Sequence, residues 1–154
     1  MVTLEPPRRL PVDADLWHMT GLSQRGLNTF LRAARRHVGL RGEVDVLLAG
    51  DATLRRLNRA FRHKNKPTDV LSFPADPALA EHHAGDLAIS LETAQRQADE
   101  FGHTLRDEVR VLMLHGLLHL AGFDHETDGG EMAGREHELR RVLRLPAGLI
   151  ARVA

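Results

Sequence analysis

Residues 115–125 place three histidines at a spacing that suits the binding of one metal ion. His115 and His119 are four residues apart, so on a helix they project from one face with Cβ atoms about 6 Å apart. Gly122 follows, and glycine readily takes the left-handed conformation that ends a helix and reverses the chain. The reversal brings His125 back toward the other two imidazoles. The pattern predicts a site with three histidine ligands and open coordination positions, as in catalytic zinc centres.

Such a site favours the hydrolysis of phosphodiesters. Neutral imidazoles leave a divalent cation with its full charge, so it attracts anions and lowers the pKa of a bound water toward about 7. The rival is a metzincin-like metalloprotease, because metzincins share the histidine spacing. In metzincins, however, a glutamate directly after the first histidine acts as general base. That position here is Gly116, which cannot transfer a proton, so a protease is the weaker alternative.

The charge of the chain is unevenly distributed, although the net charge is zero. Residues 1–75 carry 13 basic and 7 acidic side chains (+6), whereas residues 76–154 carry 8 and 14 (−6). An acid-free stretch from Ala52 to Thr68 holds six cations: Arg55, Arg56, Arg59, Arg62, Lys64 and Lys66. Soluble surfaces usually mix both signs, so this stretch favours a nucleic-acid partner over a merely solvated helix face. For any single arginine, both interpretations stay open.

Composition indicates one domain. A chain of 154 residues can bury its own core, and with no cysteine any zinc must be held by histidine or carboxylate. Residues 1–15 contain prolines and charges but no apolar run. We therefore expect a cytoplasmic protein with no signal peptide and no membrane partner.

Hydrophobic periodicity predicts an α+β or α/β fold. We expect the α+β class, with a mixed, partly parallel four-stranded sheet, helices packed on it and the metal site at the end of a central helix. Asp51 is expected to cap a helix that points Leu54, Leu57 and Phe61 inward. Residues 62–68 are polar and include a proline, so they are expected to form a loop. The domain covers residues 1–154, with 1–20 and 146–154 peripheral. Further helices are expected over about 22–40, 91–101, 105–121 and 130–143, and strands over about 43–48, 69–73 and 85–90.

Two residues near the motif have more than one interpretation. Asp124 either orients a ligand imidazole from outside the coordination sphere or lies in solvent. His103 precedes Thr104, which with Asp107 forms a helix-capping pattern, so His103 is expected at a helix terminus rather than as a fourth ligand.

Three blocks of the sequence resemble the YbeY endoribonuclease family of rRNA maturation factors. Residues 115–125 are similar to the family signature HGxLHLxGYDH. Residues 57–74 resemble the block LNxxYRxxxxPTDVLSFP, and residues 85–90 resemble GDIxIS. Phe61 and Phe123 stand where tyrosine is common. The blocks follow the family's order, and the resemblance covers about residues 43–143.

The resemblance implies a zinc-dependent, single-strand-specific endoribonuclease, active in maturation of the 3′ end of small-subunit ribosomal RNA and in ribosome quality control. His115, His119 and His125 would hold one zinc ion per chain. His115 and Arg62 would be catalytic, with Arg62 at a phosphate. Contacts to the RNA would come from Arg59, Arg62, Lys64 and Lys66. Expected partners are ribosomal RNA and the ribosome or its small-subunit assembly factors. The alternative is a non-catalytic assembly factor with structural zinc.

Overall fold

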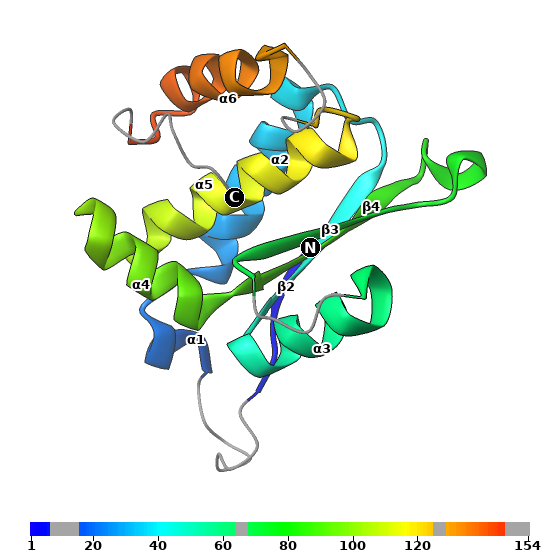
Figure 1. The fold of residues 1–154 in the computed structure, drawn as a ribbon. Coiled ribbons are helices and arrows are strands. Elements are labelled where there is room, and N and C mark those ends of the chain that lie inside the picture. Colours follow the sequence, from blue (N-terminus) through cyan, green and yellow to red (C-terminus); the bar gives the residue numbers. More distant parts are fainter. Residues whose placement is uncertain (7–15, 64–67, 125–128, 147–154) are drawn as a thin grey trace.

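A computed structural model of the chain describes residues 1–6, 16–63, 68–124 and 129–146 (Figure 1). The strands are β1 (Val2–Leu4), β2 (Glu43–Ala49), β3 (Val70–Pro74) and β4 (His83–Ser90). The helices are α1 (Leu16–Thr20), α2 (Gln24–Val38), α3 (Asp51–Arg62), α4 (Leu91–Phe101), α5 (Leu105–Leu120) and α6 (Glu131–Val142), with a short 3-10 helix η1 (Pro77–Leu79). Within these described ranges, no helix combines the length and apolar character that crossing a membrane requires.

The strands form one mixed sheet in the order β1-β2-β4-β3, which confirms the predicted fold class. β1, β2 and β4 are parallel, and β3 pairs antiparallel with β4 at one edge. Strand β1 is not predicted, since residues 1–20 are expected to be peripheral. In the structure Val2 is fully buried and pairs with Val46. A strand of three residues is too short for its alternation to be recognised.

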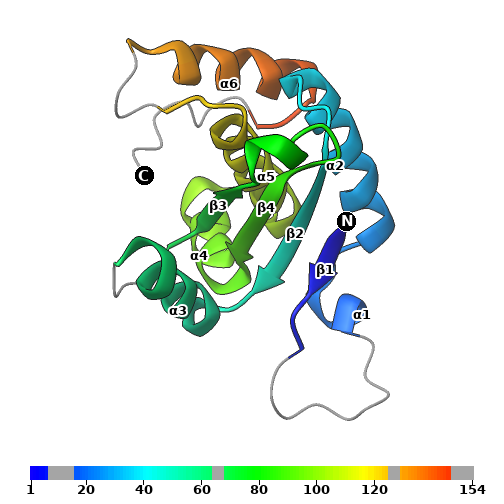
Figure 2. The same cartoon turned by 90° about the vertical axis from the view of Figure 1, so that its right-hand side faces the viewer.

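The helices cover the two faces of the sheet unequally. Helices α2 and α5 lie on one face, α3 lies on the opposite face, and α6 packs against the far side of α5 (Figures 1 and 2). Successive side chains of a strand point to opposite faces, so Leu87 and Ile89 join the larger core beneath α5. Ala88 instead joins a small apolar cluster with Leu54 of α3. The sheet therefore separates α5 from α3.

Most of the predicted helix caps are present. The Ser90 side chain accepts a hydrogen bond from the Thr93 amide, and Gly102 ends α4 in the left-handed conformation. Asp51, however, is the first helical residue of α3, and Gly50 occupies the cap. Burial raises the pKa of Asp51, but hydrogen bonds from Ser90, Thr93 and Arg96 outweigh it and hold the pKa below its usual value. Asp51 thus links the starts of α3 and α4.

The prediction that Phe61 points into the core is wrong. Phe61 is 66% exposed. Asn58, four residues after the buried Leu54, takes the next position facing the sheet and is itself buried. Phe61 is therefore left at the margin of α3, where its ring contacts Phe73 of β3.

Candidate metal centre

Helix α5 holds two of the predicted ligands in a fixed frame. Its first turn is capped as predicted, because the Thr104 hydroxyl accepts a hydrogen bond from the Asp107 amide at 3.1 Å. Nine of its 16 residues are buried between the sheet and the neighbouring helices. A helix packed on several sides cannot turn about its axis, so the directions of His115 and His119 are set by the core.

The two histidines face one another through the nitrogens that usually bind metals. His115 Nε2 and His119 Nε2 are 3.1 Å apart, and both residues are partly buried. Two nitrogens bound to one tetrahedral zinc ion at about 2.0–2.1 Å would lie about 3.3 Å apart. Two imidazole lone pairs at this separation repel unless a proton or a cation lies between them. The pair therefore fits a metal ion without rearrangement.

The other nitrogen of His115 has a carboxylate partner that the sequence did not reveal. His115 Nδ1 lies 3.4 Å from Glu136 Oε1 on α6, and both side chains are only 12% exposed. An imidazole that donates from Nδ1 to a carboxylate presents the Nε2 lone pair to a metal. The almost fully buried Arg140 donates to the same carboxylate oxygen at 3.3 Å.

The environment of Glu136 favours its charged form. Burial alone raises the pKa of this carboxyl, but the hydrogen bond and charge of His115 and the charge of Arg140 outweigh burial. The pKa of Glu136 therefore lies below its ordinary value, and the carboxylate remains an acceptor at neutral pH. No signal in the sequence indicates this role, because Glu136 is 21 residues from His115 and only the packing of α6 on α5 joins them.

Gly116, which replaces the metzincin glutamate, has a structural role. It is buried against the sheet, and its carbonyl accepts a hydrogen bond from the Ser72 hydroxyl at 3.2 Å. A Cβ atom at this position would lie 2.8 and 3.0 Å from the two Cδ atoms of Leu87. The space beside residue 116 is therefore filled by the core, and a glutamate side chain does not fit there.

The chain reverses after α5 as predicted. Gly122 has a φ of +95°, and its amide donates to the His119 carbonyl at 3.0 Å. Asp124 follows in a half-buried position. His125 lies outside the described residues, so its approach to His115 and His119 stays a prediction, as does the partner proposed for Asp124.

Only two of the four predicted RNA-binding cations lie within the residues that the structure describes. Arg59 and Arg62 are exposed on α3, on the opposite face of the sheet from α5 (Figure 1). Lys64 and Lys66 lie outside the described residues. The edge strand β3 connects the two faces, because Ser72 contacts α5 and the next residue, Phe73, contacts α3.

His103 is separated from the metal centre. It lies next to the beginning of α5, and ten residues from Leu105 to His115 span about 15 Å of helix. Its Nε2 atom is 2.6 Å from Oε1 of the fully buried Glu108. His103 therefore provides a hydrogen-bond partner for a buried carboxyl group. Its place at a helix terminus is the one expected from the sequence.

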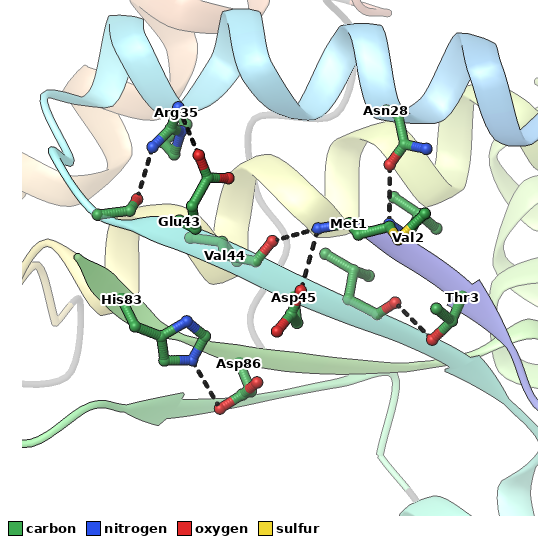
Figure 3. A network of polar contacts seen from close by, with 12 residues as sticks. Met1, Val2, Thr3, Asn28, Arg35, Glu43, Val44, Asp45, His83 and Asp86 are labelled. Carbon is green, nitrogen blue, oxygen red and sulfur yellow. Dashed lines mark hydrogen bonds and ion pairs between the residues drawn. The ribbon is translucent and has the colours of Figure 1, made fainter.

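A second group of possible metal ligands lies on the sheet. Ligand atoms of Asp45, His83 and Asp86 fall within 4.8 Å of one another, so these side chains could hold a metal ion (Figure 3). Asp45 and Asp86 are directly opposite on β2 and β4. The Met1 ammonium lies 3.2 Å from Asp45, and His83 lies 3.3 Å from Asp86. The group is largely exposed, unlike the histidines of α5.

The fold and the site define a class of protein: a single α+β domain with a pair of histidines on its central helix. Comparison with known proteins shows to which family within this class the chain is similar. The family model of endoribonuclease YbeY matches residues 15–144. Endoribonuclease YbeY of Koribacter versatilis is 52% identical over 134 residues, which cover 87% of this chain and 86% of that protein. Endoribonuclease YbeY of Aquifex aeolicus is 42% identical over 128 residues, covering 82% of this chain and 77% of that protein.

The chain belongs to the YbeY endoribonuclease family. The solution structure of TM1509 from Thermotoga maritima shares its fold, with a TM-score of 0.58 and 24% identity. That match covers 93% of this chain and 89% of the other. Membership in the family supports a nuclease activity and confirms the resemblance seen in the three sequence blocks.

Proposed function

We propose that this protein is a metal-dependent endoribonuclease that cleaves single-stranded RNA, with zinc as its ion. One observation carries the proposal: the Nε2 atoms of His115 and His119 are 3.1 Å apart, while Glu136 lies against Nδ1 of His115. This arrangement places two imidazole nitrogens where one cation could bind both. The family supplies the substrate class, because its members are named endoribonucleases.

His115, His119 and His125 would hold one zinc ion per chain, and Asp124 would orient the imidazole of His125. When bound, zinc supplies a divalent charge near the phosphodiester and lowers the pKa of a water molecule to near neutrality. Glu136 holds the tautomer of His115 that has a free Nε2, and Arg140 fixes the carboxylate. A site formed by rigid helices in this way does not need to reorganise during the reaction.

Arg62 binds the phosphate that is attacked. Its planar guanidinium can donate two parallel hydrogen bonds to phosphoryl oxygens and stabilises the negative charge that develops on them. Arg59, Lys64 and Lys66 contact neighbouring phosphates of the same strand. The proposed substrate is ribosomal RNA, at the 3′ end of the small-subunit species, and the proposed partners are the ribosome or its small-subunit assembly factors in the cytoplasm.

The test is a single-turnover cleavage assay on an unstructured RNA, combined with metal analysis of each preparation. We compare the wild type with His119→Ala and Arg62→Ala. His137→Ala is the matched control, because His137 is an exposed histidine on α6. His119→Ala is expected to lose both zinc and cleavage, Arg62→Ala to lose cleavage alone, and His137→Ala to keep both.

Two outcomes would overturn the proposal. Equal cleavage by all four preparations would show that a contaminating nuclease cuts the RNA. A wild type that retains zinc but cuts no RNA, with or without ribosomes, would favour an assembly factor with structural zinc. Cleavage of casein that depends on His119 would instead support a protease, although the buried Gly116 argues against one.

A further inference from the structure

The feature on which this inference rests is an exposed aromatic ring on α3. Phe61 is 66% exposed, and its ring makes a T-shaped contact with the ring of Phe73, with centroids 5.3 Å apart and planes at 69°. Phe73 packs against the apolar cluster between α3 and the sheet. Phe61 thus contacts a ring that is anchored in the core, while most of its own surface stays exposed. An aromatic ring held in this way offers an open surface on which a base can stack.

The surroundings of this ring carry uncompensated positive charge. Four exposed arginines lie on the same helix: Arg55, Arg56, Arg59 and Arg62. Within the described part of the chain, no ion pair engages any of them. The one acidic residue of α3, Asp51, is paired with Arg96 of α4 at 3.0 Å. The helix therefore combines a stacking ring with charges that suit a polyanion.

We propose that Phe61, supported by Phe73, stacks on an unpaired base of single-stranded RNA whose phosphates lie along the arginines of α3. Proteins that bind single strands combine a cationic track with aromatic rings, because every base has a π-face. In a duplex the bases are already stacked, so such a ring selects single strands. This inference rests on the proposed function, since it places the substrate of the α5 centre.

The edge of the sheet gives the strand a path to the metal centre. β3 is an edge strand of the sheet, and the side chains of its neighbouring residues Phe73 and Ser72 point to opposite faces. Ser72 bonds to the carbonyl of Gly116, which directly follows His115. Only the width of one strand therefore separates the aromatic pair from the helix that carries the metal ligands. Arg62 directly follows Phe61, so the row of exposed arginines on α3 includes the residue next to the ring.

The experiment measures RNA binding separately from cleavage. All proteins carry His119→Ala, so that bound RNA stays intact, and the probe is a single-stranded RNA with 2-aminopurine in place of adenine. We compare Phe61→Ala, Phe61→Trp and, as matched control, Leu79→Ala, which removes an apolar side chain that is 57% exposed in η1. A strand with abasic sites tests binding to the backbone alone. Thermal denaturation verifies that each variant is folded.

Phe61→Ala is expected to weaken binding of the single strand about tenfold and to leave binding of the abasic strand unchanged. Phe61→Trp is expected to bind normally, and its added fluorescence is expected to be quenched by the single strand. Equal affinity of Phe61→Ala and the parent protein for the single strand would overturn the inference. Equal loss for the single and abasic strands, or fluorescence of the Phe61→Trp variant that the single strand leaves unquenched, would also overturn it.

Failure of the proposed function is visible separately. If the protein with His119 intact binds RNA without cutting it, the nuclease proposal fails, while the Phe61 variants still report on stacking. If the intact protein cuts RNA and Phe61→Ala changes neither the affinity for the single strand nor the fluorescence of 2-aminopurine, which stacking on the ring would quench, the nuclease proposal stands and the stacking surface is rejected.

Discussion

The polar and charged side chains on the two faces of the sheet differ in burial and in hydrogen bonding. On the α5 face, His115 and Glu136 are largely buried, Arg140 is almost fully buried, and hydrogen bonds join the three side chains. On the α3 face, the arginines are exposed, and the described residues contain no ion pair with them. Buried, connected groups keep one geometry, which chemistry at a metal ion requires. Exposed cations keep their freedom and give salt-dependent binding of many phosphate positions.

The difference predicts which changes affect the reaction and which affect binding. Substitutions on the α5 face should alter metal affinity or stability. Substitutions on the α3 face should alter RNA affinity, except at Arg62, where the two functions meet. Four variants with matched controls test this division, from the largest expected effect to the smallest.

Arg62→Lys keeps the charge but removes the planar fork of donors. We expect single-turnover cleavage at saturating RNA to fall about 100- to 1,000-fold, a typical loss when one group that stabilises transition-state charge is removed. RNA affinity should change little, because the charge stays. The control is Arg56→Lys, also on the exposed side of α3. Equal cleavage rates for both variants would place Arg62 among the ordinary binding residues.

Glu136→Gln removes the charge that orients His115 but keeps the shape of the side chain. We expect zinc affinity, measured by competition with a chelator, to fall about 10- to 100-fold, as for other groups that support a metal ligand from outside. The control is Glu138→Gln, because the Glu138 side chain is 54% exposed on the same helix. An unchanged dissociation constant for zinc in Glu136→Gln would show that the His115–Glu136 contact does not support metal binding.

Gly116→Ala tests how tightly α5 lies on the sheet. Its new Cβ would overlap the Cδ atoms of Leu87, so we expect a loss of about 1–3 kcal/mol in the free energy of unfolding by denaturant. In the control, Gly134→Ala, the new Cβ meets no atom within 4 Å. The control should be neutral or stabilising by up to about 1 kcal/mol. The same change in both variants would contradict the close approach of α5.

Arg59→Ala should have the smallest effect of the four. Loss of one phosphate contact is expected to weaken RNA binding several-fold at low salt and to reduce the slope of log affinity against log salt by about 1. The control is Arg106→Ala, an exposed arginine in the first turn of α5. If Arg106→Ala lowers the slope as much as Arg59→Ala, the RNA does not follow α3.

Local features of the structure were predictable from the sequence. The caps at Ser90 and Thr104 and the chain reversal at Gly122 depend on neighbouring residues, and all are present. The spacing of His115 and His119 likewise placed both on one face of a helix. In each case the interaction lies within one turn or loop, so periodicity and capping rules suffice.

Features that depend on distant parts of the chain were missed. Glu136 reaches His115 only because α6 folds back on α5, and β1 forms only because β2 offers an edge. Phe61 has the spacing of a core residue, but Asn58 takes its place against the sheet. Tertiary packing decided all three, and no local pattern in the sequence encodes it.

The most direct measurement of the central claim, that the α5 histidines hold a metal ion used for RNA cleavage, is zinc add-back to chelator-treated protein, with single-turnover RNA cleavage as the readout. We predict that activity in the wild type and in His83→Ala rises in proportion to zinc and saturates at about one ion per chain, while His119→Ala stays inactive. Cleavage that survives chelation, or that zinc restores in His119→Ala but not in His83→Ala, would contradict the claim.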